Sequence, residues 1–524
     1  MTKRTSIIMG GMAAAVALTA AAGSASAATT VLYGGGSTLV EKVYRDLFNK
    51  YGNTAASELC TGLVTATKPC PTSNYNSGVA ILYVGVGSGN GLKGLENADP
   101  SLYVSGSKVP DAVPVPSTDD FGTFYGTGTG LSWVPATQPT TYFPKVTFSG
   151  SDNTLGSSDI TTASGSSLGN NPLIQIPGIV AAIAVPFKPA ANWNPKGVTV
   201  AGASSKVQLS TNTLCGIFTG KITVWNHPLI TKDNGGVRLG TGKITVVYRH
   251  DSSGTTFLFS NALVNQCGTV SRRTKSQFPI PNDWLSDNSL TAQSTTTKPY
   301  YKSGTSFFIN VFTHNHLPAN FYNDNGGASG VTGGANGSGG VKTIINATVG
   351  SIGYVSPDFV QPVDGTGPLA ANLQTYATFN AGTTPVYKAP TAANAIPIMA
   401  ATKPPAFPGP AGNPLNWGAV NPLPTSATAY PSGGFSYIDL HRCYTAAADV
   451  AALVGTTTGS AGYLTWYYGS NTVNAGAPAN ILAADGFAPV PATWVAAINR
   501  LLAAPTIGIA VVGTKGCTAV THGA

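Results

Sequence analysis

Apolar runs typical of buried β-strands alternate along this chain with patterns typical of amphipathic helices. The three clearest examples pair strand 29–33 with helix 38–51, strand 79–86 with helix 90–98, and strand 243–248 with helix 255–266. This repeated order favours an α/β fold. It also places each strand-to-helix turn at the carboxyl end of a strand, where open α/β sheets bind ligands.

The three strand-to-helix turns share a composition. They read GGGST at 34–38, GVGSG at 85–89 and DSSGT at 251–255. Glycine lets the backbone turn tightly or approach a ligand closely, and the free N–H groups of a helix N-terminus attract an anion. Capping by Ser or Thr explains any one of these turns. Three in one α/β chain indicate helix N-termini that converge on one small oxyanion.

Arg249 and Asp251 precede the third of these helices. A guanidinium forms forked, charge-assisted hydrogen bonds to an oxyanion, and Asp251 is placed to pair with Arg249 and hold the fork. The alternative is a surface ion pair. The neighbouring Ser253, Gly254 and Thr255 favour the anion site.

Length and composition bound the class of protein. The 524 residues exceed one ordinary domain, so two or more domains are expected. Hydrophobic residues make up 42% of the chain, charged residues only 9%, and the formal net charge is +8. A mild basic excess assists the approach of anions. The sequence has no dense stripe of Lys and Arg, so it does not indicate nucleic-acid binding.

Residues 1–27 are typical of an export signal. Lys3 and Arg4 precede an apolar stretch that ends in the A-x-A cleavage site Ala25-Ser26-Ala27. The mature chain is therefore expected in the periplasm or outside the cell.

The six cysteines are Cys60, Cys70, Cys215, Cys267, Cys443 and Cys517. An even count in an exported chain indicates disulfides. No pair has C-x-x-C spacing, so no zinc site or other metal is expected. Pairing of nearest neighbours, Cys60–Cys70, Cys215–Cys267 and Cys443–Cys517, is the simplest of the connectivities that six cysteines allow.

Two stretches have the composition of insertions. Residues 122–170 are rich in Gly, Ser and Thr, and residues 363–432 in Pro, Ala and Thr. Both are expected to form irregular surface loops.

A spaced set of motifs resembles the periplasmic phosphate-binding proteins of ABC transporters. These motifs are GGGSTL, VGVGSGNG, IQIPGIVAAIAVPF, LCGIFTGKITVWN, VVYRHDSSGTTFLF and GSIGYVSPDF. The first, second and fifth motifs, YVSPDF, and the segments GGFSYIDLHRCY and GFAPVPATWVAAI are most similar to the DING subgroup. The resemblance covers most of the chain after residue 27, except residues 122–170 and 270–330.

The resemblance implies a two-lobed α/β fold, the type II periplasmic-binding-protein fold. Each lobe is a mixed sheet flanked by helices, and the ligand lies in the cleft between the lobes. Lobe one is expected at 28–182 and 436–524, and lobe two at 183–435. The pairs Cys215–Cys267 and Cys443–Cys517 also fit the DING-like pattern.

The resemblance also assigns the phosphate ligands. Lobe one would supply Thr38, the Leu39 amide, Ser88 and an aspartate, and lobe two Arg249, Ser253, Gly254 and Thr255, with Asp251 bracing the arginine. The segment VPSTDDFG offers Asp119 for the aspartate, or else Asp120. A carboxylate accepts the proton of hydrogen phosphate, whereas sulfate has no proton to give and is repelled.

The expected function is capture of inorganic phosphate, by a monomer without a cofactor, for a membrane ABC-transporter permease. The alternative is a secreted phosphoesterase that uses the same anion site.

Two other motifs give weaker indications of function. GSSLG at 165–169 matches the hydrolase G-x-S-x-G turn but follows no strand, and His314 and His316 have no carboxylate or cysteine nearby in sequence.

Overall fold

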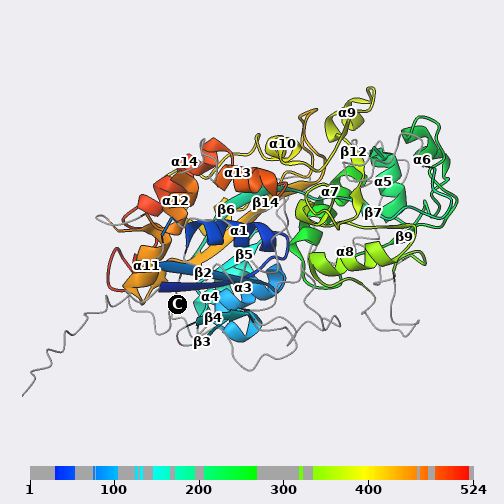
Figure 1. Ribbon diagram of the computed structural model, residues 1–524. Helices are drawn as coiled ribbons and strands as arrows, with labels where there is room; N and C mark the ends of the chain where they lie inside the picture. Colours follow the sequence, from blue (N-terminus) through cyan, green and yellow to red (C-terminus); the bar gives the residue numbers. More distant parts are fainter. Residues whose placement is uncertain are drawn as a thin grey trace, which may run out of the picture.

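The fold is known from a computed structural model. It describes residues 30–52, 75–76, 78–103, 124–127, 130–133, 145–165, 172–194, 206–267, 318–322, 334–456, 461–469 and 478–517. The ribbon has two halves side by side, one coloured mainly blue, cyan and orange-red and the other green and yellow (Figure 1). The chain ends therefore build one half, and the middle of the chain builds the other.

The first half, lobe one, is built on a six-stranded mixed sheet of order β16-β6-β14-β5-β1-β2. The strands are β1 (Thr30–Gly36), β2 (Val79–Gly85), β5 (Phe148–Ser151), β6 (Leu173–Ala182), β14 (Gly433–His441) and β16 (Ala488–Pro489). β1 runs parallel to β2 and β5, while β14 runs antiparallel to β5 and β6. A small antiparallel hairpin, β3 (Phe124–Thr127) with β4 (Gly130–Trp133), forms a sheet of its own.

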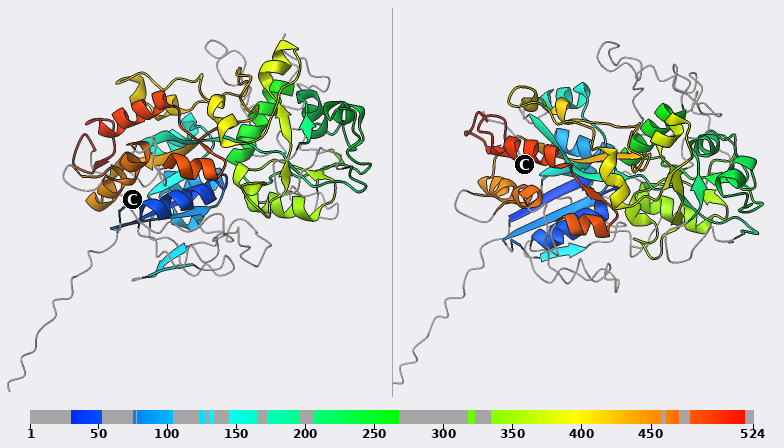
Figure 2. Two further views of the ribbon diagram at one scale, coloured as in Figure 1. Left: turned by 45° about the horizontal axis from the view of Figure 1, so that its top comes forward. Right: turned by 90° about the horizontal axis from the view of Figure 1, so that it is seen from above.

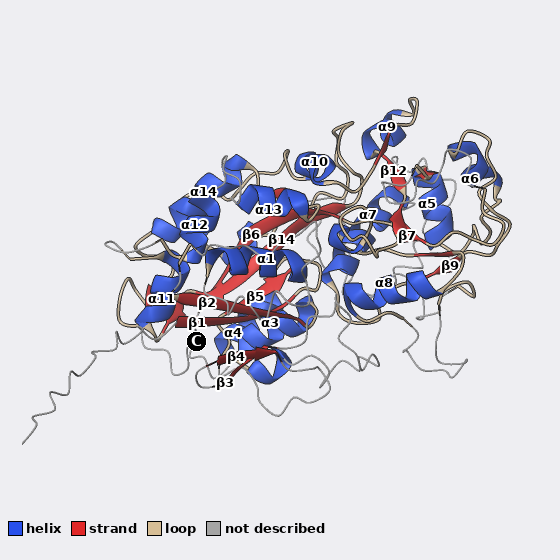
Figure 3. Ribbon diagram, viewed as in Figure 1, coloured by secondary structure: helices blue, strands red, loops and turns tan. Residues whose placement is uncertain are grey.

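Helices flank the sheet of lobe one (Figure 3). They are α1 (Glu41–Tyr51), α3 (Ser88–Asn97), α4 (Ser157–Gly165), α11 (Ala447–Val454), α12 (Tyr463–Gly469), α13 (Pro478–Ala484) and α14 (Ala492–Ala503), with the 3-10 turn η1 (Pro100–Tyr103). α1 shows how the pattern sets the packing: Val43, Leu47 and Tyr51 recur every four residues and are fully buried. Tyr44 and Phe48 complete that face, and Phe48 meets Tyr463 of α12 edge to face.

The second half, lobe two, has a four-stranded sheet of order β11-β7-β10-β9 and a three-stranded sheet of order β13-β12-β8. The strands are β7 (Pro186–Phe187), β8 (Gln208–Leu209), β9 (Thr245–Val246), β10 (Ser351–Ile352), β11 (Leu369–Ala370), β12 (Asn372–Gln374) and β13 (Tyr387–Lys388). The helices are α5 (Thr211–Phe218), α6 (Pro228–Asp233), α7 (Gly254–Cys267), α8 (Gly337–Ala347) and α9 (Tyr376–Ala381), with the 3-10 turn η6 (Pro357–Phe359). The segment after α9 and β13 packs on lobe one instead: α10 (Ala392–Ala395) and the 3-10 turns η7 (Ile396–Ile398) and η9 (Pro414–Trp417) contact β6, and η8 (Pro410–Gly412) contacts η9.

Among the described residues, the chain leaves the sheet of lobe one after β6 and returns to it at β14. β6 ends at Ala182 in the sheet of lobe one, and β7 begins at Pro186 in the sheet of lobe two; the return leads into β14 at Gly433. The two halves also lie side by side when the molecule is seen from two further directions (Figure 2). Mixed sheets flanked by helices in two lobes confirm the predicted fold class.

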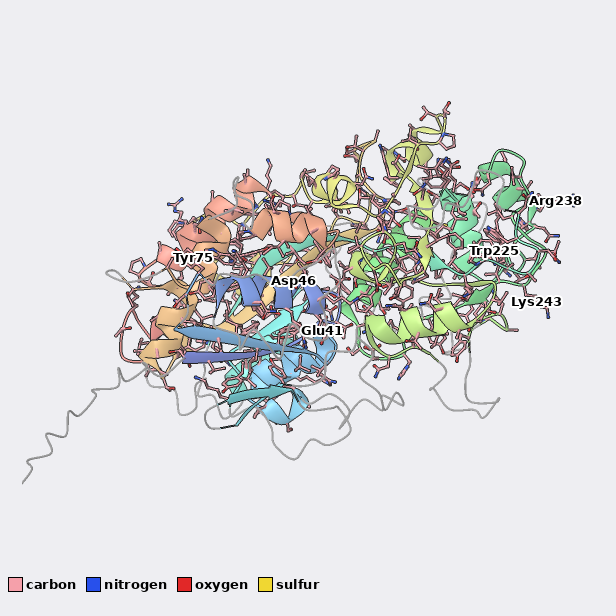
Figure 4. All side chains as sticks on the ribbon, viewed as in Figure 1. Glu41, Asp46, Tyr75, Trp225, Arg238 and Lys243 are labelled. Atoms are coloured by element: carbon pink, nitrogen blue, oxygen red, sulfur yellow. A yellow bond between two sulfur atoms is a disulfide. The ribbon has the colours of Figure 1, made fainter. Side chains whose placement is uncertain are left out.

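The predicted strands and helices are confirmed with small shifts of their ends. The three strands correspond to β1, β2 and β9, and the three helices to α1, α3 and α7. The motif LCGIFTGKITVWN contains most of α5, and the helix is followed by Gly220 at φ +70, as is common at helix ends. Trp225 is fully buried and its indole N–H donates to the Gly350 carbonyl at 2.9 Å (labelled in Figure 4).

The prediction that residues 122–170 form an irregular surface loop is wrong for the part from 145 to 165. Phe148–Ser151 is β5, a fully buried strand between β14 and β1, and α4 follows it. The strand is only four residues long, and its Gly and Ser make it resemble a loop by composition. A small residue is required at position 150 because a Cβ there would overlap the hydroxyl oxygen of Tyr83.

The prediction for residues 363–432 is also partly wrong. That stretch contains β11, β12, β13, α9 and α10, and its Trp417 and Tyr430 are buried. Burial of these aromatic side chains fixes the proline-rich segments against the core.

Two predicted disulfides are present. Cys215 joins Cys267 and Cys443 joins Cys517, each with Cα atoms 5.7 Å apart. The first ties α5 to the end of α7, and the second links β15 (Cys443–Tyr444) to the segment after its partner strand β17 (Ala510–Val511). The predicted pair Cys60–Cys70 lies outside the described residues.

Candidate anion-binding site

The turn after β1 brings Ser37, Thr38 and Leu39 to the edge of lobe one. Gly36 has φ +141, a conformation open to glycine, and the Ser37 amide donates to the Gly150 carbonyl at 2.8 Å. α1 begins at Glu41, three residues later than predicted, so the three residues form an extended turn before the helix. The Leu39 amide donates to Ser37 Oγ at 3.0 Å.

Thr38 contacts lobe two directly. Its Oγ1 accepts a hydrogen bond from the backbone amide of Ser338, at the start of α8, at 3.3 Å. Because this bond uses a lone pair of the hydroxyl, the Thr38 proton is left to donate elsewhere.

The turn after β2 places Ser88 beside a buried carboxylate. Gly87 has φ +83, α3 begins at Ser88, and the Ser88 side chain is fully buried. Ser88 Oγ accepts from the Asp152 amide at 3.2 Å. The Ser88 hydroxyl therefore also keeps its proton for another acceptor.

Asp152, the residue after β5, is the carboxylate at this site. It is fully buried, and the Ser37 hydroxyl donates to its Oδ2 at 2.7 Å. Its other oxygen, Oδ1, is buried without a hydrogen-bond partner. Burial raises the pKa of Asp152 to about 6, against the opposing effects of the Ser436 and Ser37 hydroxyls and of the Arg249 charge.

Arg249 supplies the positive charge from lobe two. Its side chain is 1% exposed, and Asp251 accepts from its Nε and Nη2 in a two-pronged ion pair. Burial lowers the pKa of Arg249, but the charge and hydrogen bonds of Asp251 outweigh burial and raise it. The remaining nitrogen, Nη1, is buried without a partner.

Ser253 directly precedes α7, and Gly254 and Thr255 begin the helix. All three are buried, and Ser253 Oγ accepts from the Thr256 amide at 3.1 Å, as a helix cap does. Gly254 lies against lobe one: a Cβ there would be 2.5 Å from Asp152 Oδ2 and from Ser88 Oγ. Only a glycine allows the two lobes to approach this closely.

The structure therefore brings the described members of the predicted ligand set together where the lobes touch. Around that contact are an unpartnered acceptor, Asp152 Oδ1, an unpartnered donor, Arg249 Nη1, and hydroxyls that keep a proton to donate. Leaving buried polar atoms unpaired is costly. Such a set is suited to a small oxyanion that carries a proton.

The candidates Asp119 and Asp120 lie outside the described residues. The sequence does not predict Asp152 as a ligand, because its segment has the Gly, Ser and Thr composition of an insertion. A usable signal was present, since "KVTFSGSDN" at 145–153 is an apolar run that ends in Gly, Ser and Asp, like the other three turns.

Other residues with possible catalytic chemistry in the sequence are His250, His314 and His316, and the serine of the GSSLG motif. His250 Nδ1 lies 2.9 Å from the Gly334 carbonyl, a structural contact. His314, His316 and residues 166–169 of the GSSLG motif fall outside the described ranges. Within the ranges that are described, no group of His, Cys, Asp and Glu is placed to hold a metal ion, and no helix has the length and apolar character to cross a membrane.

Two α/β lobes with a charged, hydrogen-bonding site between them define a ligand-binding class of protein. The model of the PBP superfamily domain matches residues 22–409. The chain belongs to the PBP superfamily.

Its relatives carry two kinds of name. It is 28% identical over 456 residues to alkaline phosphatase L of Pseudomonas aeruginosa strain UCBPP-PA14, which covers 84% of this chain and 86% of the relative. It is 29% identical over 387 residues to a phosphate-binding protein of an unknown prokaryotic organism, covering 71% and 84%.

Solved structures share the fold. A phosphate-binding protein from Stenotrophomonas maltophilia superposes with a TM-score of 0.57 at 23% identity, over 94% of this chain and 98% of that one. A high-affinity periplasmic phosphate-binding protein, PfluDING, bound with phosphate, gives 0.55 at 23%, over 92% and 96%. The resemblance to DING and phosphate-binding proteins is confirmed at the level of family and fold.

Proposed function

We propose that this protein captures one inorganic phosphate between its lobes and delivers it to a membrane ABC-transporter permease. The observation that carries the proposal is the buried pair of unpartnered atoms, Asp152 Oδ1 and Arg249 Nη1. Hydrogen phosphate satisfies both, because its P–OH donates to the carboxylate and its other oxygens accept from the guanidinium. The names of the relatives support the same ligand.

The ligand set in this proposal is Thr38, the Leu39 amide, Ser88, Asp152, Arg249, Ser253, Gly254 and Thr255, with Asp251 holding Arg249. Asp152 takes the role first expected of Asp119. The same proposal includes export of the mature chain and action as a monomer. It also places lobe one at 28–182 and 436–524 and lobe two at 183–435.

Calorimetry with protein that has been unfolded, dialysed and refolded to remove carried-over ligand tests the proposal. Phosphate is expected to bind at one site per chain, and sulfate is expected not to compete near neutral pH. Absence of phosphate binding by refolded protein with native far-UV circular dichroism would overturn it.

A secreted phosphoesterase is the second candidate. It is favoured by the alkaline phosphatase L relative and by the Ser37–Asp152 hydrogen bond, which resembles a nucleophile beside a base. The test is whether chelator-treated protein releases phosphate from a chromogenic ester. Hydrolysis that disappears in Ser37→Ala would support this function; equal rates in that variant and the wild type would exclude Ser37 as the nucleophile.

A further inference from the structure

Ser37 holds a position that the phosphate proposal does not use. Its hydroxyl donates to Asp152 Oδ2 at 2.7 Å and accepts from the Leu39 amide at 3.0 Å. Both Ser37 and Asp152 are essentially inaccessible to solvent, at 1% and 0% exposed. The contact joins residues 115 positions apart, so it is a product of the tertiary fold.

The backbone of Ser37 is fixed from two directions. Its amide donates to the Gly150 carbonyl at 2.8 Å, and its carbonyl accepts from the Tyr83 hydroxyl at 2.9 Å. Gly150 lies in β5, two residues before Asp152, which directly follows that strand. The Ser37 hydroxyl and the Asp152 carboxylate are therefore held against each other by the pairing of β1 with β5 and by Tyr83 of β2.

We propose that Ser37 is a positioning residue that fixes the Asp152 carboxylate so that Oδ1 alone accepts the phosphate proton, and that it thereby sets the discrimination between phosphate and sulfate. The inference rests on the proposed phosphate-binding function. With Oδ2 bound by the Ser37 hydroxyl, Oδ1 is the carboxylate oxygen left without a hydrogen-bond partner. A hydroxyl that donates to a carboxylate also stabilises its ionised form, the form that repels sulfate.

The environment of Asp152 contains further charged and titratable groups. Those that act on it are Arg249 with its partner Asp251 from lobe two, Tyr83 from β2, and Tyr437 and Asp439 from β14. Burial raises the pKa values of Tyr83, Tyr437 and Asp439, so the tyrosines stay neutral near neutral pH. Arg249 remains charged throughout. Asp439 is the group that a control must separate from Asp152.

Sulfate affinity as a function of pH reports on the protonation of Asp152, because sulfate stays fully ionised between about pH 5 and pH 8. Protonated Asp152 can donate to a sulfate oxygen, so sulfate affinity should rise as pH falls through the pKa of Asp152. Ser37→Ala removes a hydrogen bond to the ionised form. The pH midpoint of the rise should therefore move up, by about one pH unit or more.

Three variants serve as controls. Ser149→Ala makes the same change at another buried serine of β5 and should keep the wild-type midpoint. Ser37→Thr keeps the hydroxyl and should also keep it. Asp152→Asn should bind sulfate with no pH dependence in this range; a remaining dependence would belong to Asp439 and would overturn the assignment to Asp152.

The outcomes separate the inference from the function beneath it. A wild type that binds neither anion overturns the function. A wild type that binds phosphate and rejects sulfate, with the same midpoint in Ser37→Ala and Ser149→Ala, overturns the role of Ser37 alone. If Ser37→Ala does not fold, Ser37→Thr replaces it in the test. A midpoint in Ser37→Thr that moves up as far as expected for Ser37→Ala, although the hydroxyl is kept, would also overturn the role of Ser37.

Discussion

The guanidinium of Arg249 carries a full positive charge in the protein interior, since the side chain is only 1% exposed, and Asp251 orients it. Arg249→Ala should weaken phosphate binding by about tenfold to a hundredfold, because a charged hydrogen bond contributes roughly 1.5–3 kcal/mol and Asp251 is left without its partner. Calorimetry on the refolded variant measures the loss. An unchanged dissociation constant would place the anion site elsewhere.

Asp152 is expected to lower the stability of the ligand-free protein at neutral pH. Its pKa in the folded protein is about 6, above the ordinary value of 3.8, so ionisation costs folding free energy above that pH. The cost is on the order of 3 kcal/mol at pH 7 and disappears as pH falls from about 6 to about 4. Asp152→Asn should therefore stabilise the ligand-free protein near pH 7.5, and by about half as much near pH 5.

Urea unfolding of wild type and Asp152→Asn at the two pH values checks this expectation. An equal gain at both would mean that the charge of Asp152 is not the source. The same variant should lose its preference for phosphate over sulfate, because an amide donates to either anion.

At the scale of elements, the first turn of α7 has to fit against lobe one. Alanine at Gly254 would place its Cβ 2.5 Å from Asp152 Oδ2 and from Ser88 Oγ. Overpacking of this kind costs about 1–3 kcal/mol. Gly254→Ala should therefore weaken phosphate binding by roughly tenfold.

The helix itself should not suffer from this change, since alanine favours helix more than glycine does. The melting temperature of ligand-free Gly254→Ala is expected to equal or exceed that of the wild type, while its phosphate affinity falls. A parallel loss of both would show that the substitution disturbs the fold of α7 and not the approach of the lobes.

At the scale of the whole molecule, an ion pair joins the lobes next to the anion site. Lys42 of α1 donates to Asp364 Oδ2 at 3.3 Å and to the Asp358 carbonyl at 3.2 Å, and lies over the ring of Phe359. Asp364 also pairs with Lys342 of α8. Burial opposes its ionisation, but the charges of Lys42 and Lys342 lower the pKa of Asp364 to about 2, so the pair is charged at neutral pH.

Lys42→Met should speed phosphate release by roughly threefold to thirtyfold, because the contact forms only when the lobes are together. Asp364 keeps Lys342 in this variant. Stopped-flow measurement of release is the test, and Lys93→Met, the same change at an exposed lysine of α3, is the control. Equal release rates in the two variants would exclude a role for this ion pair in holding the lobes together.

Most of the fold could be predicted from local patterns. The α1 face that contains Leu47 and Tyr51 follows directly from hydrophobic spacing. Short strands were harder: β5 has four residues and three of them are Gly or Ser, so its burial depends on neighbours in space. For the same reason, the sequence did not indicate Asp152, the residue after β5, as a candidate ligand.

The sequence by itself determined which residues lie in strand-to-helix turns, and so nominated Ser88, Arg249 and Gly254, because each turn is encoded by neighbours in the chain. The tertiary structure alone decided what those turns meet. Ser37 reaches Asp152 across 115 residues, Thr38 reaches Ser338 across 300, and Lys42 reaches Asp364 across 322. No local pattern encodes such contacts, because they depend on how β5 inserts beside β1 and on how the two lobes come together.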